Sequence, residues 1–290
     1  MISRGLPLVL ILVLWPDPAL AWGPGVHLAL GNELLTGALA LSAPIYKIMR
    51  GYPTAFLYGA LSADIFIGKG SRFNPGHSHN WAVGFRLLDE ASEPFLRAFA
   101  LGYLSHLGAD VVAHNCFVPN MLCFTPAGGK FSHTYVEAQA DMKVPRVADQ
   151  AQSLFRLGLG EADKILLEAV GKRRLPFEVR KRLFRGGLSI LATKSWKNGL
   201  WLLKGHLSTA GDESFLAEML DLSLRCVVDV LEAGRGSDVV RQDPIGSRNL
   251  KAIKLLRRKQ RFSPSGGKIM YPLFPVPAEL ENLALPRRTT

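Results

Sequence analysis

The fold of this chain is decided by one stretch, Tyr103-Leu104-Ser105-His106-Leu107-Gly108-Ala109-Asp110-Val111-Val112-Ala113-His114. Its three ionisable groups, His106, Asp110 and His114, stand at i, i+4 and i+8, which places them along one slowly drifting stripe of an α-helix. The neighbouring residues are mostly apolar, so the helix is expected to lie in the core. Burying three ionisable groups is costly unless they are paired or bind a metal. The stretch therefore predicts a core helix that carries metal ligands.

More histidines and acids gather in the N-terminal half of the chain. Six of the seven histidines lie between residues 27 and 133, and only His206 lies beyond them. One buried histidine alone is usually a hydrogen-bonding group of the core, and His206 is interpreted in that way. Zinc binds neutral imidazole nitrogen and carboxylate oxygen, so two i, i+4 pairs of histidine and acid favour a shared zinc site. The candidates outside the opening stretch are His27, Asp64, His77, His79, His133 and Glu137.

The first 21 residues have the features of a secretory signal peptide. Arg4 is followed by an apolar core of about ten residues, too short for a membrane span of about 20. Ala19-Leu20-Ala21 is typical of a cleavage site, although an uncleaved anchor is the alternative. We expect an exported protein, periplasmic or extracellular, that begins at Trp22. Its free amine would lie five residues before His27, and an α-amine titrates near pH 8, so a metal can displace its proton.

The composition indicates a globular protein with anionic partners. Of the 290 residues, 48% are hydrophobic, which is ample for a core, and the formal net charge is +11. This charge favours phospholipid surfaces, nucleic acid or phosphate-containing substrates without choosing among them. Basic residues cluster at 172–174, 180–182 and 250–261. These clusters are either solvated helix faces or docking surfaces for anionic lipid or nucleic acid.

The pattern along the chain predicts an all-α protein. We expect one helical domain over 22–262, after the signal peptide 1–21, and an irregular basic tail over 263–290. A disulfide between Cys116 and Cys123 and two free thiols are equally open, and Cys226 is expected to be free. Loops are predicted at 68–76 and 119–130, and one helix is expected to begin near His133. The other predicted helices are 26–49, 54–65, 80–90, 94–115, 160–171, 176–184, 188–206, 213–234 and 247–260.

An ordered set of motifs within residues 22–141 resembles the zinc-dependent phospholipase C family. The motifs are Trp22-Gly-Pro-x-x-His27, Tyr58-Gly-Ala-Leu-Ser-Ala-Asp64, His79-Asn-Trp81, His106-x-x-x-Asp110 and His133-x-x-x-Glu137. The family includes secreted bacterial phospholipases C, the catalytic part of clostridial alpha-toxin and the N-terminal domain of glycosylphosphatidylinositol-specific phospholipase D. Fungal single-strand nucleases share its fold. The resemblance implies a single helical domain of the phospholipase C and zinc nuclease type.

The resemblance also implies three zinc ions and a set of ligands for each. The amine and carbonyl of Trp22 with His27 would hold one ion. Asp64, His79 and His106 would hold a second, with Asp110 bridging these two ions. Asp64 is also implied as a general base, while a metal-activated hydroxide cleaves the phosphodiester of a phospholipid. The third ion would be held by His114, His133 and Glu137.

Two details and two further functions stay open. In the secreted phospholipases, the spacing between the bridging aspartate and the next histidine is longer than the spacing between Asp110 and His114 in this chain. His77 and His79 are alternatives for one ligand position, and the following Asn80-Trp81 favours His79.

A nuclease of the same fold would act on nucleic acid instead of phospholipid. A noncatalytic zinc-stabilised module that binds anionic membrane surfaces is the third alternative. The sequence does not indicate an oligomeric state.

Overall fold

A computed structural model describes residues 22–39, 41–66, 77–124, 130–144, 148–172, 174–191, 213–259 and 272–285. In this part of the chain every regular element is helical, so the predicted all-α class is confirmed. No helix in it is long and apolar enough to cross a membrane. The predicted signal peptide, the 68–76 loop and most of the 188–206 helix lie outside the described residues.

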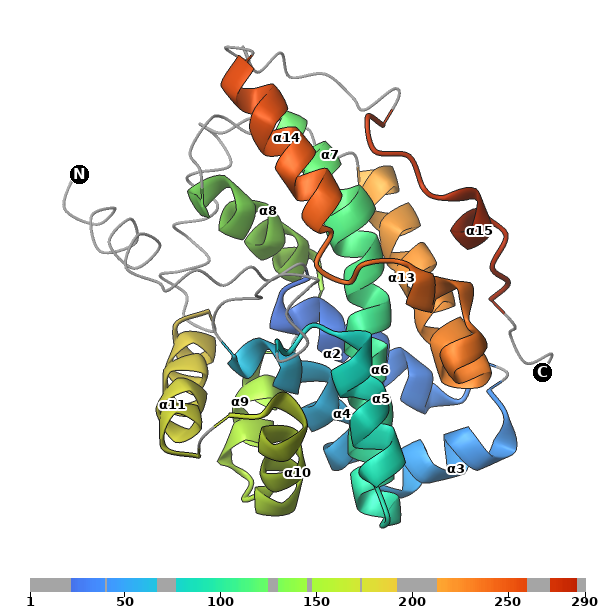
Figure 1. Ribbon diagram of the computed structural model, residues 1–290, viewed down its shortest axis with the longest axis vertical. Coiled ribbons are helices and arrows are strands. Elements are labelled where there is room, and N and C mark those ends of the chain that lie inside the picture. Colours follow the sequence, from blue (N-terminus) through green and yellow to red (C-terminus); the bar gives the residue numbers. More distant parts are fainter. Residues whose placement is uncertain are drawn as a thin grey trace.

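The helices follow the predicted order through most of the chain (Figure 1). Short 3-10 turns are labelled η, except η3, which is a π-helical turn. The elements are α2 (Pro24–Thr36), α3 (Ala43–Gly51), α4 (Pro53–Ser62), η2 (Ala63–Ile65), α5 (Trp81–Glu90), α6 (Pro94–Val112), η3 (Ala113–Phe117), α7 (Val118–Phe124), α8 (Lys130–Lys143), α9 (Ala148–Arg156), α10 (Gly160–Val170), α11 (Arg174–Leu191), α13 (Glu213–Ala233), η4 (Gly234–Gly236), η5 (Asp238–Arg241), α14 (Ser247–Lys259) and α15 (Ala278–Glu281).

Helix α6 is the central element of the fold. It is buried on all sides, from Ala98 to Val112 without interruption, which is the pattern of a helix enclosed by others. Its main neighbours are α4, α5 and α13, with α2 and α3 also in contact. Figure 1 shows α6 in the middle of the molecule, with α13 along one side. The ionisable groups on α6 are therefore surrounded by protein.

Two glycines allow α4 and α6 to touch through their backbones. A Cβ atom on Gly59 would overlap the carbonyl of Phe99, and one on Gly102 would overlap the carbonyl of Phe56. The contact is therefore reciprocal, and neither helix can carry a side chain there. It fixes the end of α4, where Asp64 follows in η2, against the middle of α6. The glycines thus place two candidate ligand segments side by side.

The predicted loop at 119–130 is wrong over its first half, because α7 continues there as a buried helix. Pro119 is the first residue of the predicted loop. However, the π-helical turn η3 ends the hydrogen-bond pattern of α6, and Pro119 falls in the first turn of α7, where a missing N–H costs little. Asn120 also binds residue 274 through its side chain, with Oδ1 accepting from the Phe274 N–H and Nδ2 donating to the Phe274 carbonyl.

Two other helix boundaries differ from the prediction. The segment 26–49 is broken into α2 and α3, because Gly37 takes the left-handed conformation, with φ of 82°, that ends a helix. By contrast, α11 is one continuous helix that includes residues 176–184 and extends to 191, across the predicted break between 184 and 188. Its Gly187 and Leu188 are buried, and α11 packs on α9. Tertiary packing therefore overrides the helix-breaking tendency of Gly186-Gly187.

The structure resolves the cysteine alternatives in favour of free thiols. Cys116, Cys123 and Cys226 are all free and buried. Cys116 and Cys123 are seven residues apart on the continuous helical run of η3 and α7. That spacing separates their Cα atoms by about 10 Å along the axis, whereas a disulfide needs about 5.5 Å. A disulfide would therefore require this helical segment to unwind.

The native protein is expected to protect its three thiols from alkylation. Burial raises the pKa of Cys116 to about 12 and that of Cys123 to about 11, so little reactive thiolate exists at pH 8. Iodoacetamide should modify none of them quickly in the folded chain and all of them after unfolding without reductant. Mass spectrometry of both samples measures this. A single modified thiol in the unfolded, unreduced sample would contradict the free state.

Candidate metal centre

Asp110 is the residue around which the candidate ligands gather. Its Oδ1 lies 3.3 Å from Nε2 of His27, and its Oδ2 lies 3.3 Å from Nε2 of His79 and 3.4 Å from Nε2 of His106. Nε2 of His114 is 3.7 Å from the same Oδ2. The side chain is fully buried on α6. One carboxylate thus reaches residues from α2, from α6, from η3 and from the segment before α5.

Two groups of donor atoms share this centre within the described residues. His27, His106 and Asp110 form one, and Asp64, His79 and His106 form the other. In the second group, Oδ1 of Asp64 is 3.1 Å from Nε2 of His79, and the Nε2 atoms of His79 and His106 are 3.0 Å apart. Two imidazole nitrogens at that separation cannot both carry a proton. Buried imidazole lone pairs converging with carboxylate oxygens form a donor set that fits zinc.

The hydrogen bonds behind the ligands set the imidazole tautomers. Nδ1 of His106 lies 2.9 Å from the carbonyl of Ala60 in the last turn of α4. A carbonyl can only accept, so Nδ1 carries the proton, and Nε2 of the neutral ring presents its lone pair to the centre. Nδ1 of His79 lies 3.1 Å from Oγ of Ser78. Tyr103 donates to the Ser78 carbonyl and so fixes the segment that carries His79.

The electrostatic field at the centre favours positive charge. Burial lowers the pKa of His27, and the nearby His106 lowers it further, while Asp110 opposes both effects. For His106, burial also acts to lower the pKa, but Asp110 and Asp64 outweigh it, and the pKa is raised. The carboxylates therefore stabilise a cation between them. A bound divalent metal would meet the same need.

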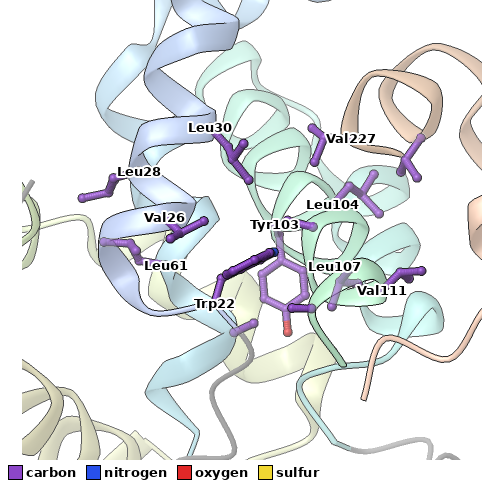
Figure 2. Packing of buried hydrophobic residues seen from close by; sticks show 14 of the residues in the cluster. Trp22, Val26, Leu28, Leu30, Leu61, Tyr103, Leu104, Leu107, Val111 and Val227 are labelled. Carbon is purple, nitrogen blue, oxygen red and sulfur yellow. The ribbon is translucent and has the colours of Figure 1, made fainter. Parts of the chain in front are cut away.

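Trp22 lies just before α2, and His27 lies in its first turns, five residues later. The Gly23 carbonyl accepts from the N–H of Val26 and of His27, so the chain turns into α2 directly after Trp22. The Trp22 side chain is fully buried, stacks on Phe117 at 4.6 Å and donates from Nε1 to Oγ of Ser223. Figure 2 shows it among the buried side chains of α2 and α6. The backbone of Trp22 is thus held close to the segment that carries His27.

The structure describes the side chains of two members of the third predicted ligand group, His114 and Glu137. His114 is buried in η3 and is joined to the centre through Asp110. The π-helical turn carries His114, so the short spacing after Asp110 does not remove it from the centre. Glu137 is buried on α8 but is in neither donor group. His133 lies on α8 four residues earlier, and its side chain is outside the described residues.

His77 lies outside the donor groups, beside a cavity of about 200 Å³ next to the centre. His79 lines the same cavity and belongs to one of the donor groups, so the cavity adjoins the centre. His77 is buried, and burial lowers its pKa, while Asp243 opposes this. The cavity lining is His77, His79, Asn80, Trp81, Val240, Arg241, Gln242, Asp243 and Pro244.

Sequence reasoning missed the residues that place the ligands. Gly59 and Gly102 hold α4 against α6, and their only signal in the sequence is glycine inside two apolar helices. Asp141 accepts from two backbone N–H groups of α2. Asp141 stands four residues after Glu137, just as Glu137 stands four residues after His133. Continuing this spacing by one step would therefore have indicated Asp141. Tyr103 gave no signal beyond its place in the opening stretch.

The fold and the site together define an all-helical protein with a buried cluster of histidines and carboxylates that could hold a metal ion. The family model described as zinc dependent phospholipase C matches residues 26–172, half of the chain. The chain therefore belongs to the zinc-dependent phospholipase C family, a family of hydrolases that act on phospholipids. No curated protein and no solved structure matches the chain.

Proposed function

We propose that this chain is an exported zinc-dependent phosphodiesterase of the phospholipase C type, active in the periplasm or outside the cell after cleavage before Trp22. The observation that carries the proposal is the convergence of His27, His79 and His106 on Asp110, with Asp64 against His79 and His106 and all five residues buried. Such a cluster is costly in a protein core unless a metal neutralises it. Membership of the family supports zinc as the metal and a phospholipid as the substrate class.

The proposed ligands form three groups around three zinc ions. Trp22, through its amine and carbonyl, and His27 hold the first ion. Asp64, His79 and His106 hold the second, and Asp110 serves both, because its two oxygens face the two donor groups. His114, His133 and Glu137 hold the third.

The residues around the centre supply positioning and proton transfer. Zinc in such a site acts as a Lewis acid that lowers the pKa of a bound water and neutralises phosphate oxygens. Asp64 is the proposed general base. It lies in a 3-10 turn at the end of α4 and contacts His79 and His106, whereas Asp110 contacts His27 as well as these two histidines. Asp64 is therefore the better placed of the two for proton transfer, while Asp110 holds charge at the middle of the centre.

The cavity beside His79 is the proposed place for the polar headgroup. It adjoins the metal ligands, and the half-buried Trp81 gives it an aromatic wall. Trp81 is fixed there, since its Nε1 donates to the Gln242 carbonyl at 2.9 Å. A phosphodiester whose phosphate reaches the centre would therefore place its headgroup against Trp81 and leave the diacylglycerol part outside.

Helix α14 is the proposed contact with an anionic membrane surface. Lys251, Lys254 and Arg258 are exposed, and Leu255 and Leu256 between them are 47% and 37% exposed. A helix with exposed basic and apolar side chains is suited to the interface of an anionic bilayer. Because its attraction is electrostatic, binding should weaken as salt rises.

The proposed function is tested by assaying the mature protein, beginning at Trp22, on three substrates after zinc loading. The substrates are phosphatidylcholine vesicles, the same vesicles with added phosphatidylglycerol, and single-stranded DNA. We expect release of diacylglycerol and phosphocholine, faster on the anionic vesicles at low salt, and loss of activity with a zinc chelator. Chelation should also lower the melting temperature, because zinc binds only the folded centre.

Each alternative gives a different pattern in this assay. Cleavage of DNA without release of diacylglycerol would show the nuclease. Zinc binding and vesicle binding with no hydrolysis of any substrate would show the noncatalytic module. A protein that binds no zinc would contradict all three functions.

A further inference from the structure

Asp141 joins the last turn of α8 to the first turn of α2. Its Oδ2 accepts from the N–H of Gly25 at 3.1 Å, and its Oδ1 accepts from the N–H of Val26 at 3.0 Å. The Gly25 N–H has no partner inside the helix, because the first turn of any α-helix lacks preceding carbonyls. The Val26 N–H is shared between Asp141 and the Gly23 carbonyl, which lies 3.1 Å away. A side chain usually satisfies such N–H groups from the residue just before the helix. Here the residue before α2 is Gly23, which has no side chain, and the carboxylate comes from 116 residues further along the chain.

The segment after Trp22 is shaped around this carboxylate. A Cβ atom on Gly23 would overlap the carboxyl group of Asp141, and one on Gly25 would lie 2.9 Å from its carbon. Pro24 between them has no N–H to satisfy. The sequence Gly23-Pro24-Gly25 therefore leaves room for a carboxylate against the backbone itself. The bonds fix the main chain between Trp22 and His27.

The indole ring and the main chain of Trp22 are held by different contacts. Phe117 and Ser223 hold the indole. Neither contact restrains the rotation of the main chain around Gly23. Asp141 supplies that restraint from the following turn. A backbone amine that ligates a metal needs such a restraint, because an amine at the free end of a chain has no other.

We propose that Asp141 is the positioning residue that holds the start of the mature chain, so that the Trp22 amine and His27 bind the same zinc ion. This inference rests on the proposed function, since it needs both cleavage before Trp22 and a metal at His27. Asp141 touches neither the metal ligands' donor atoms nor the substrate in this role. It acts through the backbone of Gly25 and Val26.

Asp141→Ala and Asp141→Asn in the mature protein test this role. Ala removes both acceptor oxygens, and Asn keeps one of them with almost the same shape, so Asn remains informative if Ala fails to fold. We expect Ala to bind the first zinc ion about 10- to 100-fold more weakly, with a smaller effect for Asn. Zinc per chain is measured by mass spectrometry of the metal during titration with a competing chelator.

The reactivity of the Trp22 amine gives a second readout that does not depend on activity. Zinc bound to the amine should protect it from acetylation at neutral pH, and this protection should be lost in the Asp141 variants. The matched control is Glu232→Gln. Glu232 on α13 accepts from the Ser42 N–H ahead of α3 at 2.6 Å, so it makes the same kind of bond at a different helix start. The control should keep wild-type zinc content and amine protection.

The outcomes separate this inference from the proposed function. Wild-type protein that binds zinc and protects its amine, with folded Asp141 variants that do the same, would overturn the inference and leave the function standing. Wild-type protein that binds zinc without protecting its amine would overturn the role of Trp22 and this inference with it. Wild-type protein without zinc would overturn the proposed function as a whole.

Discussion

Asp110→Asn is expected to lower phosphodiesterase activity by at least about 10³-fold, or about 4 kcal/mol of transition-state stabilisation. The substitution keeps the shape of the side chain and removes its charge. Asp110 contacts residues of both donor groups, with Oδ1 near His27 and Oδ2 near His79 and His106. We therefore expect the loss of more than one zinc ion per chain, measured by metal analysis beside the assay.

Thermal unfolding separates a ligand role for Asp110 from a purely structural one. A carboxylate kept for zinc stabilises the fold only when zinc is present, because its buried charge is otherwise a cost. Asp110→Asn should therefore melt below wild type with zinc and at or above wild type with a chelator. The control is Asp163→Asn, which removes a buried carboxylate bound to Tyr58 and Lys181. It should lower stability in both conditions and keep zinc, and the same behaviour from Asp110→Asn would contradict the ligand role.

One extra residue ahead of Trp22 is expected to lower activity by at least about 10²-fold. The extra peptide bond converts the Trp22 amine into an amide, which cannot give a lone pair to a metal at neutral pH. The proteins to compare begin at Trp22 and at a glycine placed before it, and both are assayed for zinc content and phospholipid hydrolysis. The uncleaved precursor should behave like the extended protein.

Trp22→Phe is the matched control for the extended protein. It keeps the amine, the carbonyl and an aromatic ring against Phe117, and it loses the hydrogen bond to Ser223 and part of the buried indole. We expect a loss of about 2 kcal/mol in stability with zinc content unchanged. Full zinc content and activity in the glycine-extended protein would contradict a role for the amine and place the first zinc ion on His27 and Asp110 alone.

The central helix and its stripe were predictable because three ionisable residues recur at helical spacing in an apolar setting. His106, Asp110 and His114 follow from that pattern, and all three are buried around one centre. The contacts with Asp64 and His79 depend on how helices pack, which residue spacing alone does not give. The resemblance to a known family placed those two candidates in one ligand group with His106.

The features that sequence reasoning missed are those that depend on backbone geometry. Pro119 was taken as the start of a loop, although a π-helical turn ahead of it makes the position suitable for proline. Gly59 and Gly102 matter only because two particular backbones meet there. Asp141 binds backbone N–H groups that are more than a hundred residues away in the sequence. No local sequence pattern indicates a contact at such a separation.

The π-helical turn Ala113–Phe117 makes the number of residues in this segment a constraint of its own. Deleting one residue would let the turn relax into an ordinary α-helix, which is an easy change for the local backbone. The deletion would leave α7 in nearly the same orientation, because five residues of a π-turn and four residues of an α-helix sweep about the same angle. It would instead change the places of His114 and Asn115 within the turn, and with them the contact of His114 with Asp110 and the bond of Asn115 to the Asp243 carbonyl at 2.8 Å. Most substitutions in this segment are therefore expected to be less damaging than a deletion. Members of the family should differ here in residue type more often than in the number of residues.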